Sequence, residues 1–408
     1  MNLAEALRPS NNNFDLIRLT AAVAVIIGHS YALLPTPGAV DVIGALLKFD
    51  YSGSLSVKVF FFLSGLLVTN SLLKNPSLKV FILSRGLRIW PAFFVVLVIC
   101  AIVIGPLLTN LSVVDYLSDR AVFRYVGDGL LMNIKFELPG VFKGHSSTAV
   151  NGSLWTIPYE VFAYIFLACG AYFGILRQKI AATLLCALII IDPVFDQKFV
   201  FNWLPDNSEV TFLAPCFAMG VLSAIYQDKL IISGSTAFAF FTLAYLFSNS
   251  PFKQLLFYSG LFSLIIYIAT RHSIIRLKAK SDVSYGVYLW GFPTQQCLVA
   301  FFPTFGLAFH QIVAILISII LGWLSWHGVE KHAMAYARQL RDKIAERSRS
   351  DETVSHVQPN LNEYSPQNPD PVLSHELPAS PHVHTPLPSP PVSIYTSSHV
   401  PKSAQSPP

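Results

Sequence analysis

Arg18 and His29 stand in a largely apolar stretch of the chain, between Phe14 and Leu34. Inside a membrane span an ionisable side chain costs free energy unless it lines a cavity or finds a partner, so its usual reason is function. Eleven residues at 3.6 per turn return to nearly the same helix face, about 16 Å along the axis. Histidine exchanges a proton near neutral pH, and a guanidinium contacts phosphate or polarises a carbonyl. The spacing therefore predicts that both side chains face one cleft.

Other polar side chains interrupt later apolar stretches. Arg85 and Arg88 are one helical turn apart, and paired guanidinium groups suit phosphates, although ordinary anchoring at a membrane surface also explains them. Glu160 is the only charged residue between Asn151 and Leu176, which predicts a partner such as Arg18 or a bound sugar.

The apolar residues form blocks of the length that crosses a membrane. Hydrophobic residues make up 53% of the chain and charged residues 12%, and the mean hydropathy is +0.52, as in integral membrane proteins. A span needs about 20 apolar residues. The sequence predicts an all-α, polytopic transmembrane bundle of about ten spans, at 14–34, 54–73, 88–108, 152–176, 180–195, 209–226, 231–248, 254–270, 282–302 and 308–329.

The loops after every second span are basic. Cytoplasmic loops carry an excess of Lys and Arg, so this pattern predicts that both termini are cytoplasmic. The net charge of +5 thus reflects membrane topology and is poor evidence for nucleic-acid binding. The basic residues are Lys74, Lys79, Arg85 and Arg88, then Arg177 and Lys179, then Lys229, then Arg271, Arg276, Lys278 and Lys280, and after the last span Lys331, Arg338, Arg341, Lys343 and Arg347.

Four segments follow from these patterns. They are a cytoplasmic N-terminal segment at 1–13, a transmembrane domain at 14–331, a basic juxtamembrane segment at 332–350, and a Pro- and Ser-rich cytoplasmic tail at 351–408. The tail has too few apolar residues to offset its chain entropy, so we expect it to be disordered, either as a solvated tail or as a ligand for a cytoplasmic partner. The five cysteines lie in apolar blocks without Cys-x-x-Cys spacing, so no disulfide framework and no metal site is predicted.

Short motifs follow one another along the apolar region. They are Phe14-Asp15 with Arg18 and His29, Val57-Lys-Val-Phe-Phe-Phe-Leu-Ser64-Gly65, Phe81-x-x-x-Arg85-x-x-Arg88-Ile-x-Pro91, Asn151-Gly-Ser-Leu-Trp155-Thr-Ile-Pro-Tyr-Glu160, Ser284-Tyr285-Gly-Val-Tyr288-Leu-Trp290, and Trp326-x-x-Val-Glu330-Lys331. In this order they resemble the membrane acyltransferase 3 family, integral membrane O-acyltransferases that modify bacterial surface and secreted glycans. Each motif alone is weak, and their order is specific.

The resemblance implies an enzyme of the bacterial inner membrane that uses acetyl-CoA as its donor. It would transfer the acetyl group from the cytoplasm to a hydroxyl of a lipopolysaccharide, exopolysaccharide or smaller oligosaccharide, which could be lipid-linked. His29 fits the general base of this reaction. The alternative for His29 is a histidine hydrogen-bonded to a neighbouring carbonyl, and for Arg18 a side chain that extends to the interface. Arg85 and Arg88 would bind the phosphates of coenzyme A, with Arg18 along the path of the thioester.

The acceptor is assigned to the block that ends at Glu160. Trp155 and Tyr159 are aromatic faces of the kind on which sugars stack, and the alternative for Trp155 is an interfacial aromatic belt. Glu160 joins His29 and Arg18 as a candidate catalytic residue. Ser64 and Gly65 favour close helix packing over a nucleophile, because Gly-x-Ser-x-Gly is absent.

One position departs from the family pattern. Much of the family has an acidic residue where this chain has Lys58. A carboxylate that orients the histidine is then missing there, and Asp41, Asp50 or Glu160 could take its place.

Two other classes of protein share part of this pattern. A transporter or flippase of a lipid-linked glycan also has many spans and a few buried charges, but needs no coenzyme A. A scaffold that recruits a cytoplasmic protein through the Pro-rich tail would lose its function when 351–408 is deleted.

Overall fold

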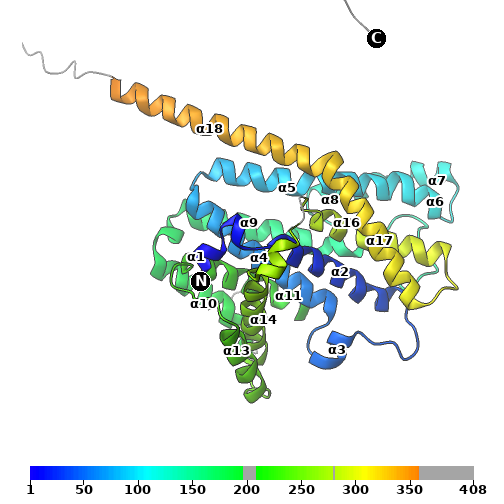
Figure 1. Ribbon diagram of the computed structural model, residues 1–408. Helices are drawn as coiled ribbons and strands as arrows, with labels where there is room; N and C mark the ends of the chain where they lie inside the picture. The colour runs from blue at the N-terminus through cyan, green and yellow to red at the C-terminus, as the bar shows by residue number, and fades with distance from the viewer. Residues whose placement is uncertain (196–207, 279–280, 358–408) are drawn as a thin grey trace, which may run out of the picture. The chain divides into compact units, whose positions relative to one another are not determined.

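The computed structural model describes residues 1–195, 208–278 and 281–357, and within these ranges the chain is all-helical with no β-strand (Figure 1). Met1–Asp351 form one compact unit, and the next, from Glu352 on, is described only as far as Val357. The predicted tail therefore falls almost wholly outside the described residues. The five cysteines are all free.

Five of the described helices are long and apolar enough to cross a membrane. They are α2 (Phe14–Leu33), α4 (Ser52–Lys74), the continuous run of α5 (Leu78–Ile99), a π-helical turn (Cys100–Ile104) and α6 (Gly105–Leu108), the 3₁₀ turn η3 (Gly152–Thr156) with α9 (Ile157–Tyr172), and α17 (Leu307–Ser325) with a π-helical turn (Trp326–Glu330) and the start of α18 (Lys331–Val357).

Helices also occupy the other five predicted spans. These are α10 (Lys179–Ile191), α11 (Ser208–Thr211) with α12 (Leu213–Ile225), α13 (Gly234–Leu246), α14 (Lys253–Ala269) and α16 (Ser284–Phe301). Most of them are shorter than a typical span, so the number of ten remains a prediction. The connecting helices are α1 (Leu3–Ala6), α3 (Val42–Leu47), α7 (Val113–Ser118), α8 (Arg120–Leu130) and α15 (His272–Arg276).

The helix of the third span begins ten residues before the predicted start of that span at position 88. Ser77 caps it, and its hydroxyl accepts a hydrogen bond from the Val80 amide. Pro91 lies in the helix interior without ending it. Arg85 and Arg88 therefore project from within α5, which fixes their direction toward the bundle.

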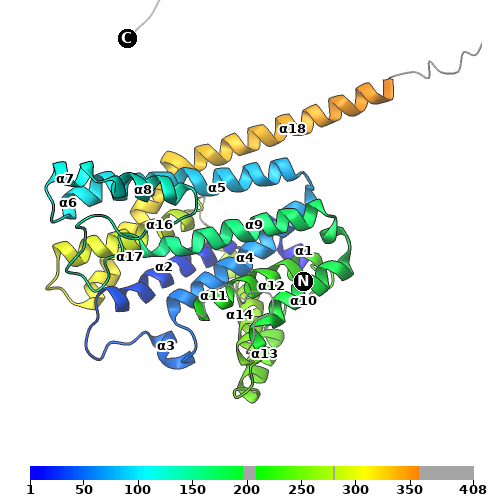
Figure 2. The ribbon, with the colours of Figure 1, turned by 180° about the vertical axis from the view of Figure 1, so that it is seen from behind.

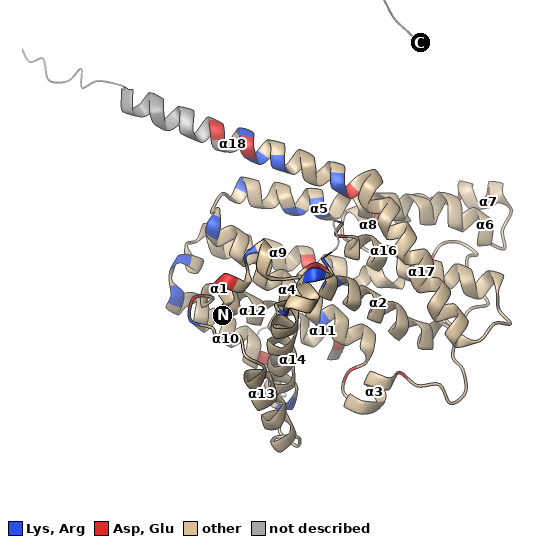
Figure 3. Cartoon of the chain, in the orientation of Figure 1, with Lys and Arg blue, Asp and Glu red and all other residues tan. Residues whose placement is uncertain are grey.

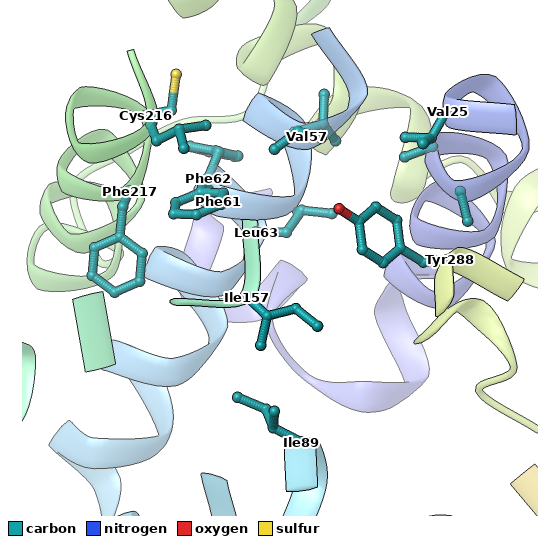
Figure 4. Close-up of a cluster of buried hydrophobic side chains, with 14 of the residues drawn as sticks. Val25, Val57, Phe61, Phe62, Leu63, Ile89, Ile157, Cys216, Phe217 and Tyr288 are labelled. Carbon is teal, nitrogen blue, oxygen red and sulfur yellow. The ribbon is translucent and has the colours of Figure 1, made fainter. Parts of the chain in front are cut away.

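α4 lies at the centre of the packing. It contacts α2 and α12, and α2 also contacts α16; Figure 2 labels these four helices. Figure 4 shows apolar side chains from α2, α4, α5, α9 and α12 around this helix, with the Tyr288 hydroxyl of α16 pointing into the cluster. This core fixes the positions of α2, α4, α5, α9 and α16 relative to one another, and these five helices carry most of the motif residues.

The contact between α4 and α12 depends on two glycines. A Cβ on Gly65 would lie 2.1 Å from the Phe217 carbonyl oxygen, and a Cβ on Gly220 would lie 2.2 Å from the Phe62 carbonyl oxygen. Small residues allow membrane helices to approach this closely. The prediction that Gly65 serves packing is thus confirmed.

We expect Gly65→Ala to lower the free energy of unfolding by about 1–3 kcal/mol, because the methyl group forces the two helix backbones apart. The measurement is the thermal unfolding midpoint in detergent. Gly86→Ala on α5 is the matched control, since no atom lies within 4 Å of a Cβ placed there. Equal midpoints for the two variants would contradict the packing role.

The two ends of α2 have different surroundings, which we call the Arg18 end and the His29 end. At the Arg18 end the N-terminal segment bonds to the loop after α12 and to the last residue of α14, through the Leu3 amide to the Leu230 carbonyl (2.8 Å) and the Asn13 amide to the Ala269 carbonyl (3.0 Å). At the His29 end Gln296 donates to the carbonyls of Ser147 and Ala149. Figure 3 shows Lys and Arg gathered at the ends of α4, α9 and α10 and along α18.

Candidate active site

A small cavity of about 60 Å³ at the Arg18 end collects polar side chains from five helices. We call it the cationic cavity, because it contains three arginines and one glutamate. Its polar lining is Arg18 of α2, Ser64 of α4, Arg85 and Arg88 of α5, Thr156, Glu160 and Tyr164 of the α9 segment, and Ser284, Tyr285 and Tyr288 of α16. The structure thus brings together four candidate residues that are spread over more than 140 positions of sequence.

Two of the three arginines are held by acids. Arg88 donates to Asp282 (2.6 Å) and to Glu330 (3.1 Å), and Arg18 lies 3.4 Å from the same Asp282 carboxylate. Ser284 donates to the other Asp282 oxygen at 2.7 Å. The expected pairing of Glu160 with Arg18 is not formed, because Asp282 takes that position. Both carboxylates bonded to Arg88 are fixed partners, so this guanidinium is a structural centre of the cavity wall.

Arg85 differs from its neighbours. Among the described residues no carboxylate lies within 4.0 Å of its guanidinium. Its partner is a tyrosine, since Arg85 donates a hydrogen bond to Tyr164, which in turn donates to Glu160 (2.5 Å), and the Ser64 and Tyr164 hydroxyls lie 2.6 Å apart. The Ser64 hydroxyl therefore contacts Tyr164 and, at 3.5 Å, the Glu160 carboxylate, and no histidine of the described residues bonds to it. Arg85 is the cation of this cavity whose charge is not balanced by an acid.

His29 lies on α2 three turns away from Arg18, outside the cationic cavity. Its ring packs edge-on against Phe292 of α16, with centroids 5.2 Å apart, and its Nδ1 atom is buried without a hydrogen-bond partner in the described part of the chain. Gly152 allows the start of η3 to approach the same Phe292, since a Cβ there would lie 2.5 Å from the ring. An imidazole nitrogen without a partner is unusual for a buried polar atom and is available to a substrate proton.

Comparison with known proteins places the chain in a family. The family model described as an acyltransferase domain, of the acyltransferase 3 type, matches residues 11–327. The chain belongs to this family. The resemblance seen in the motifs is thereby confirmed, and the protein is an enzyme, an O-acetyltransferase.

Three relatives are each 28% identical to this acyltransferase. The "O-acetyl transferase" of Shigella phage Sf6 matches 79% of the chain and 95% of its own length, and "Nodulation protein 10" of Rhizobium leguminosarum bv. viciae matches 79% and 93%. The "Peptidoglycan O-acetyltransferase OatA" of Listeria monocytogenes matches 69% of the chain and 49% of its own length. No solved structure matches significantly.

Lys58, the departure from the family pattern, is neutralised locally in this acyltransferase. Its side chain is 1% exposed and bonds to Asp50 (2.9 Å) and Ser54 (2.7 Å), and Tyr258 of α14 donates to the same Asp50 oxygen (2.9 Å). Asp41 caps α3 through the Gly44 amide. Asp50, Asp41 and Glu160 therefore each have partners other than His29.

Trp155 and Tyr159 pack on each other with ring centroids 5.9 Å apart. Tyr159 lines an apolar cavity of about 260 Å³ between α9, α10 and α12, while Trp155 is partly buried against the core. Tyr159 thus faces an apolar surface in this acyltransferase, and the structure does not place the two aromatic residues beside His29.

Asp282 and Tyr164 were missed by the sequence analysis. Asp282 holds two arginines, and the signal for it was present as an acid at the start of an apolar block. Tyr164 gives no signal in one sequence, because a tyrosine in an apolar helix is common. Within the described ranges no group of three or more His, Cys, Asp or Glu side chains could hold a metal ion.

Proposed function

We propose that this protein transfers an acetyl group from acetyl-CoA to a hydroxyl of a surface or exported glycan, across the bacterial inner membrane. The observation that carries the proposal is the placement of Arg18 and His29 at two ends of one helix. Arg18 lines a cationic cavity that suits an anionic donor, and His29 has a buried nitrogen free for a proton. The names of the phage and Listeria relatives support the acetyl group and a glycan acceptor.

The donor enters from the side that we assign to the cytoplasm, where the basic loops and the N-terminal segment meet. Arg85 binds a phosphate of coenzyme A, because it is the cavity arginine without an acidic partner. The pantetheine arm then extends past Arg18 toward His29, over the roughly 16 Å between them along α2. The cavity of about 60 Å³ is too small for this arm, so the Tyr288 and Thr156 hydroxyls, 2.6 Å apart, must separate to admit it.

The transfer step needs one proton movement and no acyl-enzyme. The His29 imidazole takes the proton of the sugar hydroxyl while the oxygen attacks the thioester carbonyl carbon. The new C–O ester bond forms and the C–S bond breaks, so that the thiolate of coenzyme A leaves. The proton on His29 returns to that thiolate or to water, and the base is restored.

The first test is the O-acetyl content of the surface glycans in the native host. A deletion strain is complemented with the wild-type gene or with an empty vector, and the glycans are analysed by NMR and mass spectrometry. Acetate restored by the wild type supports the transferase and identifies the acceptor. Glycans that keep their acetate in both strains but stay on the inner face of the membrane without the protein would favour a transporter or flippase.

We expect Arg85→Gln to weaken coenzyme A binding by about tenfold or more, since a charge-assisted contact to phosphate is lost. Binding is measured as the rise in unfolding midpoint of the purified protein with added coenzyme A. Arg120→Gln on α8, an exposed position that does not line the cationic cavity, is the control. An unchanged response of the Arg85 variant would remove Arg85 from the donor site.

A further inference from the structure

A second, larger cavity opens beside the cationic cavity, and we call it the basic groove. It has a volume of about 430 Å³, within the range of about 300–1,000 Å³ typical of small-molecule sites. The last two turns of α4, the first two turns of α5 and one face of α18 enclose it. One wall of the groove lies outside the family domain, because α18 begins after residue 327, where the family match ends, while Phe81 and Arg85 on the opposite side belong to a family motif.

Four cationic side chains line the basic groove, and none of its lining residues in the described part of the chain is acidic. They are Lys74 of α4, Arg85 of α5, and Arg338 and Arg341 of α18. Arg338 and Arg341 are three residues apart and so lie on one helix face. Arg341 contacts the exposed Asp342 of its own helix at 3.1 Å, whereas Lys74 and Arg338 have no ion-pair partner among the described residues. A cleft lined by one sign of charge concentrates anions.

Arg85 belongs to both cavities. A ligand that fills the basic groove therefore reaches the cationic cavity at Arg85. The groove also has apolar side chains between its cations, from Leu72, Val80 and Met334. Such a surface suits a flat heterocycle, and the surrounding cations suit phosphates attached to it.

We propose that the basic groove binds the phosphorylated nucleotide end of coenzyme A, with Arg338 and Arg341 on the 3′-phosphate and Arg85 on the diphosphate. This inference rests on the proposed donor. It adds a part of α18 beyond the family domain to the donor site. The adenine lies on the apolar side chains, and the pantetheine arm leaves past Arg85 into the cationic cavity.

A lipid headgroup offers the same phosphate chemistry. A phosphodiester headgroup carries a single negative charge, whereas a phosphate monoester carries about −1.5 to −2 and is joined here to a diphosphate. Four cations without an acid in the lining match the more highly charged nucleotide better. The two sources are separated by the experiment below.

The test compares coenzyme A with dephospho-coenzyme A, which lacks the 3′-phosphate, on the full-length protein in detergent without added lipid. We expect the wild type to bind coenzyme A about tenfold more tightly. In Arg338→Gln/Arg341→Gln this preference disappears, and coenzyme A affinity falls by about tenfold or more. The control Arg276→Gln/Lys343→Gln removes the same charge outside the groove and keeps the wild-type affinities.

Three results would overturn the inference. The first is equal affinity of the wild type for the two ligands. The second is that the Arg338/Arg341 variant binds coenzyme A as tightly as the wild type, while Arg85→Gln does not bind it. In that case coenzyme A remains the donor, and only the assignment of the basic groove is wrong. The third, seen by native mass spectrometry from nanodiscs that contain phosphatidylglycerol, is loss of bound lipid from the Arg338/Arg341 variant with unchanged coenzyme A affinity. A wild type that binds neither coenzyme would instead refute the donor itself.

Discussion

Replacing His29 by alanine is expected to lower acetyl transfer by at least a hundredfold while the amount of folded protein stays unchanged. A positioned general base contributes about 10²–10⁴-fold to a rate. The amount of folded protein should not change, because the buried Nδ1 atom of His29 makes no hydrogen bond in the described structure and so contributes little to stability. Activity is measured as acetate on the glycans of the complemented deletion strain, and protein level by immunoblot of the membrane fraction.

The variant His29→Gln separates a base from a packing residue. Glutamine keeps most of the volume beside Phe292 and can form hydrogen bonds, but it cannot take the proton. It should be as inactive as alanine. The control is His310→Gln on α17. His310 is 2% exposed, its Nδ1 atom lies 3.1 Å from the Gly306 carbonyl oxygen, and its Nε2 atom has no hydrogen-bond partner among the described residues, so this variant shows whether an unpartnered ring nitrogen alone explains the effect. Full activity of His29→Gln would refute the proposed base.

The local features of this fold were predictable from the sequence because they depend on short-range rules. Blocks of about 20 apolar residues place the long helices. The prediction that Arg18 and His29 face one cleft stays a prediction, because Arg18 lines the cationic cavity and His29 does not. The start of α5 was missed, since hydropathy marks the edge of the membrane, whereas a helix starts at its cap. Ser77 supplies that cap, so the helix begins at Leu78, ten residues before the predicted start of the third span.

The partners inside the site were not predictable in the same way. Arg18 meets Asp282 across 264 positions of sequence, and Arg88 meets Glu330 across 242. Which acid reaches which arginine depends on how α5, α16 and α18 pack, and this packing cannot be read from a single sequence. Because burying a charge in a membrane span costs free energy, we could predict that Glu160 and Arg18 have partners, but not which residues these are.

The second large effect is expected from Arg88→Ala. Removing this guanidinium leaves Asp282 and Glu330 without their shared partner, and Glu330 is only 2% exposed. Loss of one member of a buried ion pair costs about 3–5 kcal/mol, because the remaining charge stays out of water. We therefore expect a large drop in the unfolding midpoint and in the yield of monodisperse protein from detergent gel filtration, with Arg276→Ala on the exposed α15 as the control.

A second replacement of Arg88, by leucine, tests whether the defect is an unpaired charge. Arg88→Leu combined with Glu330→Gln removes the buried carboxylate along with the guanidinium and should recover part of the lost stability, whereas Arg88→Leu alone should not. A double variant no more stable than the single one would show that the Arg88 stem, packed near Tyr285 and Trp326, matters more than its charge. Because Asp282 precedes α16 and Glu330 precedes α18, Arg88 ties three helices together at the point where Arg85 faces the donor. We therefore expect recovery of the fold in the double variant without full recovery of coenzyme A binding.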